Sequence, residues 1–358
     1  INGEYLTLDV VESAKGRTGI TKRFPIGPIL GITPFNFPLN LVAHKIAPAL
    51  ACGNTIILKP SPQCPITALK LGEIIIDSGA VPGSVNILPT DTSIAEMLVK
   101  EKRLKLLTFT GSADVGFYLK NISGKKKVVL ELGGNAGVII HSDTDINYAA
   151  ERCAIGGFAY SGQMCISLQR IFVHNQIFEK FSEVFLEKVK NLKFGDPMNE
   201  DTIVGPLINE KSAKRTEEWI NEAITNGAKV LTGGNRNKNI FEPTVITDVS
   251  PNLKVCSNEI FAPVITLTKY EDFNDAVKEV DNSRFGLQAG IFTTDINKIW
   301  HAYENIEVGG MIINDVPTFR IDHMPYGGVK DSGRGREGIK YAIEDMTETK
   351  LLVLNFSN

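Results

Sequence analysis

The sequence has 358 residues, of which 43% are hydrophobic and 22% charged, and its formal net charge is −3. This is ordinary globular composition with length for one large or two medium domains, and without a basic excess we expect no nucleic-acid partner. No apolar run approaches the ~18 residues of a membrane span, so we expect no membrane partner. The cysteines are odd in number and scattered, without CxxC pairs or a nearby histidine cluster. We therefore expect neither a disulfide framework nor a metal site, and a cytoplasmic, reducing location fits best.

The first part of the chain predicts strands and helices in alternation. Residues 1–26 alternate in hydropathy like two strands around a turn rich in Gly and Lys, and because this is an unusual start for a domain we expect further sequence upstream. Strands are then predicted at 55–59, 84–88, 104–110 and 126–132, with a helical pattern in each interval. This order predicts a parallel, doubly wound α/β sheet, in which ligands bind at the carboxyl ends of the strands.

A second alternating series predicts a second α/β domain. Its strands are expected at 136–140, 170–174, 228–231, 264–268, 289–293 and 310–314, with helical patterns between them. Trp219 and Trp300 fall in these helical patterns and are expected to be packing residues and not substrate contacts. The apolar run at 351–355 predicts one more strand.

Two glycine-rich stretches resemble phosphate-binding motifs. GRGREG (333–338) has the spacing G-x-G-x-x-G, but no strand precedes it, so we interpret it as a surface turn that leads into a helix. TFTGSADVG (108–116) is the better candidate, because a strand there runs directly into a glycine-serine turn and a helix. The amide groups and dipole of such a helix attract phosphate, although a simple strand–helix corner explains the pattern equally well.

The stretch AYSGQMCISLQR (159–170) places Cys165 among small and polar residues. Most free cysteines are small buried hydrophobes, whereas a reactive one is a nucleophile in its thiolate form. The stretch alone does not separate these two interpretations, and the rest of the chain must decide.

Seven stretches in this order resemble the aldehyde dehydrogenase superfamily. They are ITPFNFPLN (32–40), IILKPS (56–61), FTGS (109–112), LELGGN (130–135), GQMC (162–165), NEIFAPV (258–264) and MPYGGVKDSG (324–333). The pattern is most similar to members that act on lactaldehyde or, without phosphorylation, on glyceraldehyde 3-phosphate. The family's amino-terminal segment, roughly a quarter of the usual chain, is expected to be missing before Ile1.

The resemblance implies a domain organisation and an assembly. It implies an oligomerisation hairpin at 1–26, an NAD(P)-binding domain at 27–133, a catalytic domain at 134–336, and a helix and oligomerisation strand at 337–358. The fold class is therefore α/β, with a doubly wound cofactor domain, a second α/β catalytic domain and a small β element. A homodimer or homotetramer is expected.

The resemblance also implies catalytic roles that suit the residues. Cys165 would attack the aldehyde carbon as a thiolate. The Asn36 side-chain amide and the Cys165 backbone N–H would hold the resulting oxyanion. Glu131, which follows an apolar strand and precedes two glycines, would activate the water that hydrolyses the thioester.

The resemblance further implies a site for NAD or NADP. Its residues would be Thr33 and Phe35 in the groove, Lys59 and Ser61 at the adenosine ribose, Gly111, Ser112 and Gly116 at the pyrophosphate, and Glu259 and Phe261 at the nicotinamide end. NAD-preferring relatives often carry a glutamate three residues after the lysine, where this chain has Pro62. We therefore expect NADP to be at least tolerated.

Two alternatives stay open, a CoA-acylating relative and a non-catalytic fragment that keeps the fold. The substrate is expected to be a small aldehyde. In NDVPTFRIDHMPYGG (314–328), Arg320 is a candidate for holding an anionic group on that aldehyde through paired hydrogen bonds, whereas a solvated or interface salt bridge is the slightly preferred explanation.

Overall fold

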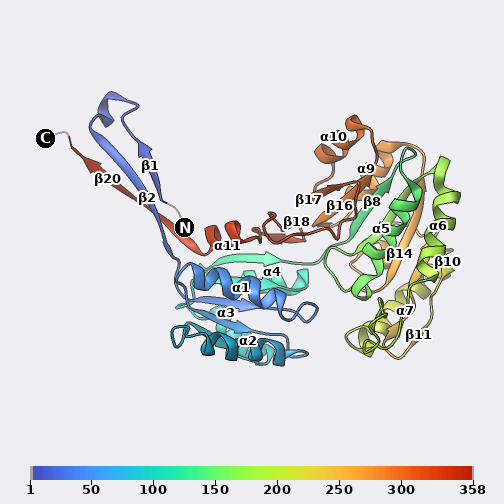
Figure 1. Cartoon of the computed structure of the whole chain (residues 1–358), viewed down its shortest axis with the longest axis horizontal. Helices are drawn as coiled ribbons and strands as arrows, with labels where there is room; N and C mark the ends of the chain where they lie inside the picture. The colour runs from blue at the N-terminus through green and yellow to red at the C-terminus, as the bar shows by residue number, and fades with distance from the viewer. Residues whose placement is uncertain (1–2, 357–358) are drawn as a thin grey trace. The chain divides into compact units, whose positions relative to one another are not determined.

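The computed structural model describes residues 3–356 and divides into two compact units (Figure 1). The first unit comprises residues 1–131, 322–325 and 335–358, and the second comprises residues 132–321 and 326–334. Residues 1–2 of the expected hairpin and 357–358 of the expected C-terminal strand region lie outside the described residues.

Parallel strands form the main sheet of the first unit. They follow in the order β7-β6-β3-β4-β5, with bounds β3 (Ile29–Ile32), β4 (Ile56–Lys59), β5 (Val85–Ile87), β6 (Leu106–Thr110) and β7 (Lys127–Glu131). The helices between them are α1 (Asn40–Ala51), α2 (Pro65–Asp77), α3 (Thr92–Lys100) and α4 (Ala113–Ile122). From β3 the chain adds strands first on one side and then on the other, so the strand order reverses between β3 and β6. Ligands bind at such a reversal in open α/β sheets.

The core of this unit explains why these residues form these elements. Ile29 and Leu106 of the strands are fully buried against Val42 and Ile46 of α1. The sequence interpretation contained neither β3 nor α1, because β3 has only four residues and α1 carries Pro48 inside the helix. Proline in a helix interior removes a backbone hydrogen bond and usually indicates a helix end.

A small antiparallel sheet completes the first unit. Its order is β1-β2-β20, with bounds β1 (Glu4–Thr7), β2 (Arg17–Pro25) and β20 (Thr347–Asn355), and η1 (Glu12–Ala14) and α11 (Ile339–Asp345) lie beside these strands in the sequence. β20 pairs with β2 along its whole length, from Arg17 opposite Asn355 to Pro25 opposite Thr347, and Figure 1 shows the two strands side by side. Large apolar side chains on this sheet and its flanks are exposed: Tyr5, Ile20, Leu351, Leu352, Val353 and Phe356.

The main sheet of the second unit runs β10-β13-β14-β9-β8-β16-β17. All its neighbouring strands are parallel except the β10–β13 pair. The strand bounds are β8 (Ala136–Ile140), β9 (Leu168–His174), β10 (Lys229–Thr232), β13 (Thr244–Thr247), β14 (Val264–Tyr270), β16 (Gln288–Phe292) and β17 (Gly310–Ile313). The longer helices are α5 (Ile146–Phe158), α6 (Phe178–Lys190), α7 (Glu210–Thr225), α9 (Phe273–Asp281) and α10 (Ile296–Asn305). Shorter elements are η2 (Ala159–Gly162), η3 (Asn175–Ile177), α8 (Lys254–Ser257), β11 (Arg236–Asn237), β12 (Ile240–Phe241), β15 (Phe285–Gly286), β18 (Val329–Lys330) and β19 (Gly333–Arg334).

Alternating side chains of this sheet fill two separate cores. Val138 and Ile140 of β8 pack with α5 and α6, whereas Ile139 between them packs with α9 and α10 on the other face. A strand that is buried on both faces is typical of a parallel sheet covered by helices on both sides. The predicted doubly wound α/β class is therefore confirmed.

The two tryptophans differ in exposure. Trp219 packs partly buried against a core, whereas Trp300 on α10 is 56% exposed and its ring lies 5.7 Å from the ring of Tyr303. Within residues 3–356, no helix combines the length and the apolar character that a membrane crossing requires.

Candidate active site

The expected site residues of the first unit lie at the carboxyl edge of its sheet. They are Thr33, Phe35 and Asn36 after β3, Lys59 and Ser61 at the end of β4, Gly111 and Ser112 after β6, and Glu131 at the end of β7. Backbone hydrogen bonds join these strand ends: the Thr33 N–H donates to the Lys59 carbonyl at 3.1 Å, and the Gly111 N–H donates to the Glu131 carbonyl at 3.0 Å. The reversal between β3 and β6 falls inside this group, as expected for a ligand site.

The side chains at this edge fit a dinucleotide. Ser112 is the N-cap of α4, and its hydroxyl makes no capping hydrogen bond, which leaves the helix N-terminus open to a phosphate. Gly116, also expected at the pyrophosphate, is buried in the first turns of this helix. The Thr33 hydroxyl is buried and, within the described residues, forms no hydrogen bond, as a group that awaits a ligand would. Burial lowers the pKa of Lys59, and the negative charge of the nearby Asp91 acts in the opposite direction.

A buried charged cluster adjoins the Glu131 strand, and the sequence interpretation missed it. The Lys45 ammonium, 1% exposed, donates to the hydroxyls of Thr108 at 3.0 Å and Thr110 at 2.8 Å, and lies 3.6 Å from a Glu337 carboxylate oxygen. Thr110 is the strand partner of Glu131, which is itself 3% exposed. A lysine in a helical pattern is normally read as a surface residue, so the sequence carried no signal for it.

In the second unit, Cys165 lies in the turn between η2 and β9. Tyr160 and Ser161, just before it, adopt positive φ of 55° and 59°, a conformation that side chains rarely take. The half-buried Cys165 sulfur is 2.8 Å from the Tyr326 hydroxyl. Strained backbone of this kind tends to occur at functional turns.

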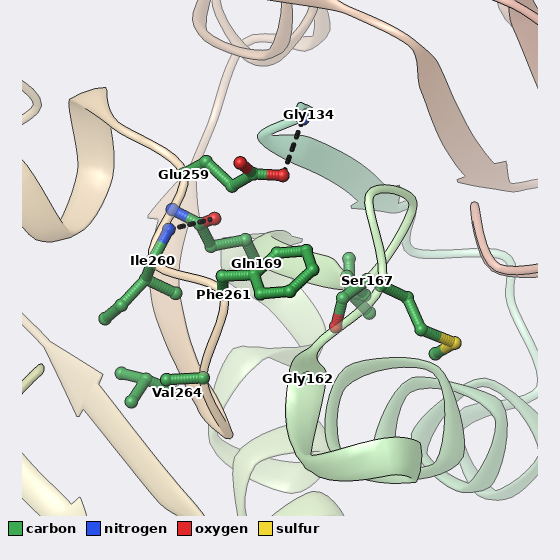
Figure 2. A pocket seen from close by; sticks show the side chains of 11 residues that line it. Gly134, Gly162, Ser167, Gln169, Glu259, Ile260, Phe261 and Val264 are labelled. Carbon is green, nitrogen blue, oxygen red and sulfur yellow. Dashed lines mark hydrogen bonds between the residues drawn. The ribbon is translucent and has the colours of Figure 1, made fainter. Parts of the chain in front are cut away.

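Glu259 and Phe261 lie in the loop that precedes β14. Figure 2 shows the Glu259 carboxylate directed at Gly134, whose N–H donates to it at 3.0 Å. Burial raises the pKa of Glu259 to about 7, while the Gly134 hydrogen bond and the charge of Arg215 act in the opposite direction. The Phe261 ring projects into the small pocket drawn in Figure 2.

Buried amides hold this loop in place. The Gln169 side chain donates to the Asn258 carbonyl at 2.7 Å and accepts from the Ile260 N–H at 3.1 Å, so that it fixes both neighbours of Glu259. A Cβ on Gly162 would collide with the Ala262 carbonyl, so only glycine lets the cysteine turn approach this loop. Sequence interpretation had no reason to choose Gln169, because its role lies entirely in these contacts.

The site residues of the second unit lie at the amino ends of β8, β9 and β14. Gly134, Cys165 and Glu259 each precede one of these neighbouring strands. This is the edge opposite to the one where ligands usually bind in parallel sheets, so the general rule predicts the first unit's site and not this one.

Arg320 does not point to open solvent. Its guanidinium lies 3.9 Å from the centroid of the Tyr326 ring, and Tyr326 is buried. Tyr326 belongs to the MPYGGVKDSG motif, but nothing in the sequence indicated that its hydroxyl reaches Cys165.

The remaining cysteines differ from Cys165. Burial raises the pKa of each of their thiols: Cys52, Cys64, Cys153 and Cys256. The histidines cluster more than the sequence suggested, since the rings of His141 and His174 lie 5.0 Å apart. Within residues 3–356, however, no three metal-ligating side chains gather in one place.

Comparison with known proteins agrees with this geometry. Residues 2–352 match the model of the aldehyde dehydrogenase family. The chain is 44% identical over 356 residues to a 3-sulfolactaldehyde dehydrogenase of Priestia megaterium, covering 99% of this chain and 75% of that protein. It is 46% identical over 341 residues to a lactaldehyde dehydrogenase of Methanococcus aeolicus, covering 94% of this chain and 73% of that protein.

Solved structures agree as well. An aldehyde dehydrogenase 21 from Physcomitrella patens, in complex with the reaction product succinate, superposes with a TM-score of 0.98 at 50% identity and covers 100% of this chain and 75% of that one. A glyceraldehyde-3-phosphate dehydrogenase from Methanocaldococcus jannaschii, complexed with NADP, gives a TM-score of 0.94 at 40% identity and covers 99% of this chain and 77% of that one. With its motifs, fold and cysteine turn all in agreement, this chain belongs to the aldehyde dehydrogenase family, whose NAD(P)-dependent members oxidise aldehydes to acids.

Proposed function

We propose that Cys165 is the nucleophile of this aldehyde dehydrogenase and that the acid is released by hydrolysis of a thioester on its sulfur. The observation that carries this proposal is the contrast between the cysteines. Cys165 is half-buried and follows the strained residues Tyr160 and Ser161, and its sulfur is 2.8 Å from a hydroxyl, whereas burial raises the pKa of the other four thiols. A thiolate is the reactive form of cysteine, and the hydroxyl beside the Cys165 sulfur is a donor that a thiolate can accept from.

The steps follow from the residues of the chain. A lone pair of the Cys165 sulfur forms a bond to the aldehyde carbon, and the carbonyl electron pair moves to oxygen. Two donors stabilise that oxyanion, the Asn36 side-chain amide and the Cys165 backbone N–H. When bound, the oxidised nicotinamide supplies the acceptor for the hydride that this adduct loses. Glu131 then removes a proton from water, the hydroxide adds to the thioester carbon, and the sulfur leaves as thiolate.

We propose that the main sheet of the first unit and its helices form the NAD(P)-binding domain, and that the small sheet of this unit is an oligomerisation element. We propose that the second unit is the catalytic domain. Gly111, Ser112 and Gly116 would hold the pyrophosphate at the start of α4, and Lys59 and Ser61 the adenosine ribose. Thr33 and Phe35 would line the groove, and Glu259 would accept hydrogen bonds from the nicotinamide ribose beside Phe261. The open N-terminus of α4 and the buried Thr33 hydroxyl support this assignment.

We propose a short aldehyde with an anionic or hydroxyl group as the substrate. The relatives named for lactaldehyde and sulfolactaldehyde support this class, and so does the reaction product succinate in the Physcomitrella patens structure. Arg320 would hold the anionic group, because a guanidinium pairs with carboxylate or sulfonate through two hydrogen bonds. The CoA-acylating and non-catalytic alternatives gain no support from these relatives.

We further propose a cytoplasmic homodimer or homotetramer. All five cysteines are free, as expected in a reducing compartment. β20 lies at the edge of the small sheet and carries exposed Leu351, Leu352 and Val353, and exposed apolar edge strands are usually paired. A monomer in sedimentation velocity would contradict the assembly.

The experiment that tests the function is Cys165→Ala. Turnover, followed by absorbance of the reduced nicotinamide with a panel of small aldehydes and both cofactors, should fall to background, and cofactor binding should persist. Cys64→Ala is the matched control, because Cys64 is also half-buried but its thiol contacts the Phe35 carbonyl, and it should keep turnover. Retained turnover in Cys165→Ala would rule out a thioester on Cys165 as the reaction intermediate.

A further inference from the structure

The contact between Tyr326 and Cys165 has the geometry of a hydrogen bond to the reacting sulfur. The Tyr326 oxygen and the Cys165 sulfur are 2.8 Å apart. Tyr326 is 4% exposed and packs against Ile166 and Leu287, so its ring is fixed by the surrounding core. A hydroxyl that is held in this way meets the sulfur without first losing side-chain freedom.

The chemistry decides the direction of this hydrogen bond. A thiol is a weak donor, a phenol is a good one, and a thiolate can only accept. A hydrogen bond to the charged form of a group favours that form. The Tyr326 hydroxyl therefore stabilises the thiolate of Cys165 more than the thiol.

Arg320 acts on the same hydroxyl through the ring. Its guanidinium lies over the face of Tyr326 at 3.9 Å from the centroid, within the range of a cation–π interaction. A positive charge there withdraws electron density from the phenol and makes its O–H a stronger donor. Arg320 is thus placed to influence the sulfur without touching it.

We propose that Tyr326 is a catalytic residue that donates a hydrogen bond to the Cys165 thiolate, and that Arg320 is a positioning residue that strengthens this donor. The proposal rests on the proposed function in that Cys165 is the nucleophile. Tyr326 keeps its proton throughout, and the proton of the resting thiol is released to solvent. When the sulfur lone pair forms the bond to the aldehyde carbon, the sulfur loses its charge and the hydrogen bond weakens.

The test measures the reactivity of the thiol alone. The rate of alkylation of Cys165 by iodoacetamide is measured from pH 5.5 to 10 by mass spectrometry of its peptide, without aldehyde or cofactor. In Tyr326→Phe, which keeps the ring, the rate near pH 6 should fall about tenfold relative to the plateau at high pH, as expected for loss of a hydrogen bond to a charged group. Arg320→Gln should also shift the pH profile of the alkylation rate to higher pH, but by a smaller amount than Tyr326→Phe.

The matched control is Tyr270→Phe. Tyr270 is also a buried tyrosine of the second unit, but its hydroxyl bonds to His141 at 2.9 Å, and its removal should leave the alkylation profile of Cys165 unchanged. A merely structural role for Tyr326 would alter the thermal midpoint but not the pH at which half the maximal rate is reached.

The outcomes separate this proposal from the proposed function. A Tyr326→Phe profile that coincides with the native one, or shifts to lower pH, overturns the proposal even if Cys165→Ala has no turnover. If Tyr326→Phe does not fold, the Arg320→Gln profile decides, and an unchanged profile there overturns the proposal. A shift to higher pH supports it, and the turnover of Cys165→Ala tests the mechanism separately.

Discussion

Replacing Glu259 by Gln should remove a pH-dependent loss of folding stability that the buried carboxyl causes in the native protein. Burial raises the pKa of this carboxyl from an ordinary 4.5 to about 7. Between these values the folded protein holds a proton on Glu259 that the unfolded chain has released. The stability that the neutral Glu259 carboxyl preserves is therefore fully present below about pH 4.5, and it is lost as the pH rises to about 7.

The expected magnitude follows from this difference. Each pKa unit corresponds to about 1.4 kcal/mol, so the native protein should lose roughly 2–3 kcal/mol of stability relative to Glu259→Gln between pH 5 and pH 8. Glutamine has the same shape and does not titrate in this range, and its side-chain oxygen can still accept the Gly134 N–H. The measurement is urea-induced unfolding of both proteins at the two pH values, and the quantity compared is the native-minus-variant free energy of unfolding.

Cofactor affinity provides a second readout of the same group. If the carboxylate accepts hydrogen bonds from the ribose hydroxyls, cofactor binding to the native protein should tighten up to about tenfold from pH 6 to pH 8, as the ionised fraction of Glu259 rises. The variant should show no such change in a fluorescence titration. Parallel pH profiles of native protein and variant, in both unfolding and binding, would refute the reasoning about burial.

The other predictions concern turnover. Glu131→Gln should release a burst of reduced cofactor and then turn over at least tenfold more slowly, and a normal steady-state rate would remove Glu131 from the mechanism. Pro62→Glu should shift the ratio of kcat/KM values toward NAD, because the exposed position follows Lys59 and Ser61 and a carboxylate there repels a 2′-phosphate. Strong NAD preference in the native enzyme would show that another group decides. Arg320→Ala should raise KM about tenfold more for anionic aldehydes than for neutral ones of similar size, whereas equal effects would exclude recognition of the anion.

The sequence predicted the elements whose apolar runs or helical periodicity extend over enough residues. The apolar run that includes Val138, Ile139 and Ile140 was correctly predicted as a strand, and the structure shows that both of its faces are buried. The failures occurred where the local signal opposed the tertiary structure. Pro48 lies inside α1, and the few residues of β3 are stable only because β4 and β6 pair with them on either side.

Motifs located the candidate residues but not their surroundings. Cys165 and Glu259 could be chosen from short stretches, whereas the hydroxyl of Tyr326 approaches Cys165 across 161 positions of sequence. The same limit applies to Lys45, whose buried partners come from β6 and from residue 337. Such contacts depend on the packed fold, and no spacing rule encodes them.

The pairing of β2 with β20 sets an order of events during synthesis. Residues 17–25 precede the second unit in the chain, whereas their partner strand, residues 347–355, follows it, so the whole second unit is translated in between. At a translation rate of about 5–20 residues per second, one edge of β2 stays unpaired for roughly 15–65 s before β20 has been synthesised. The second unit is almost continuous in sequence and can close its core during that interval. The first unit is therefore the last to be completed, and chains interrupted after the second unit would present an unpaired edge to other nascent chains.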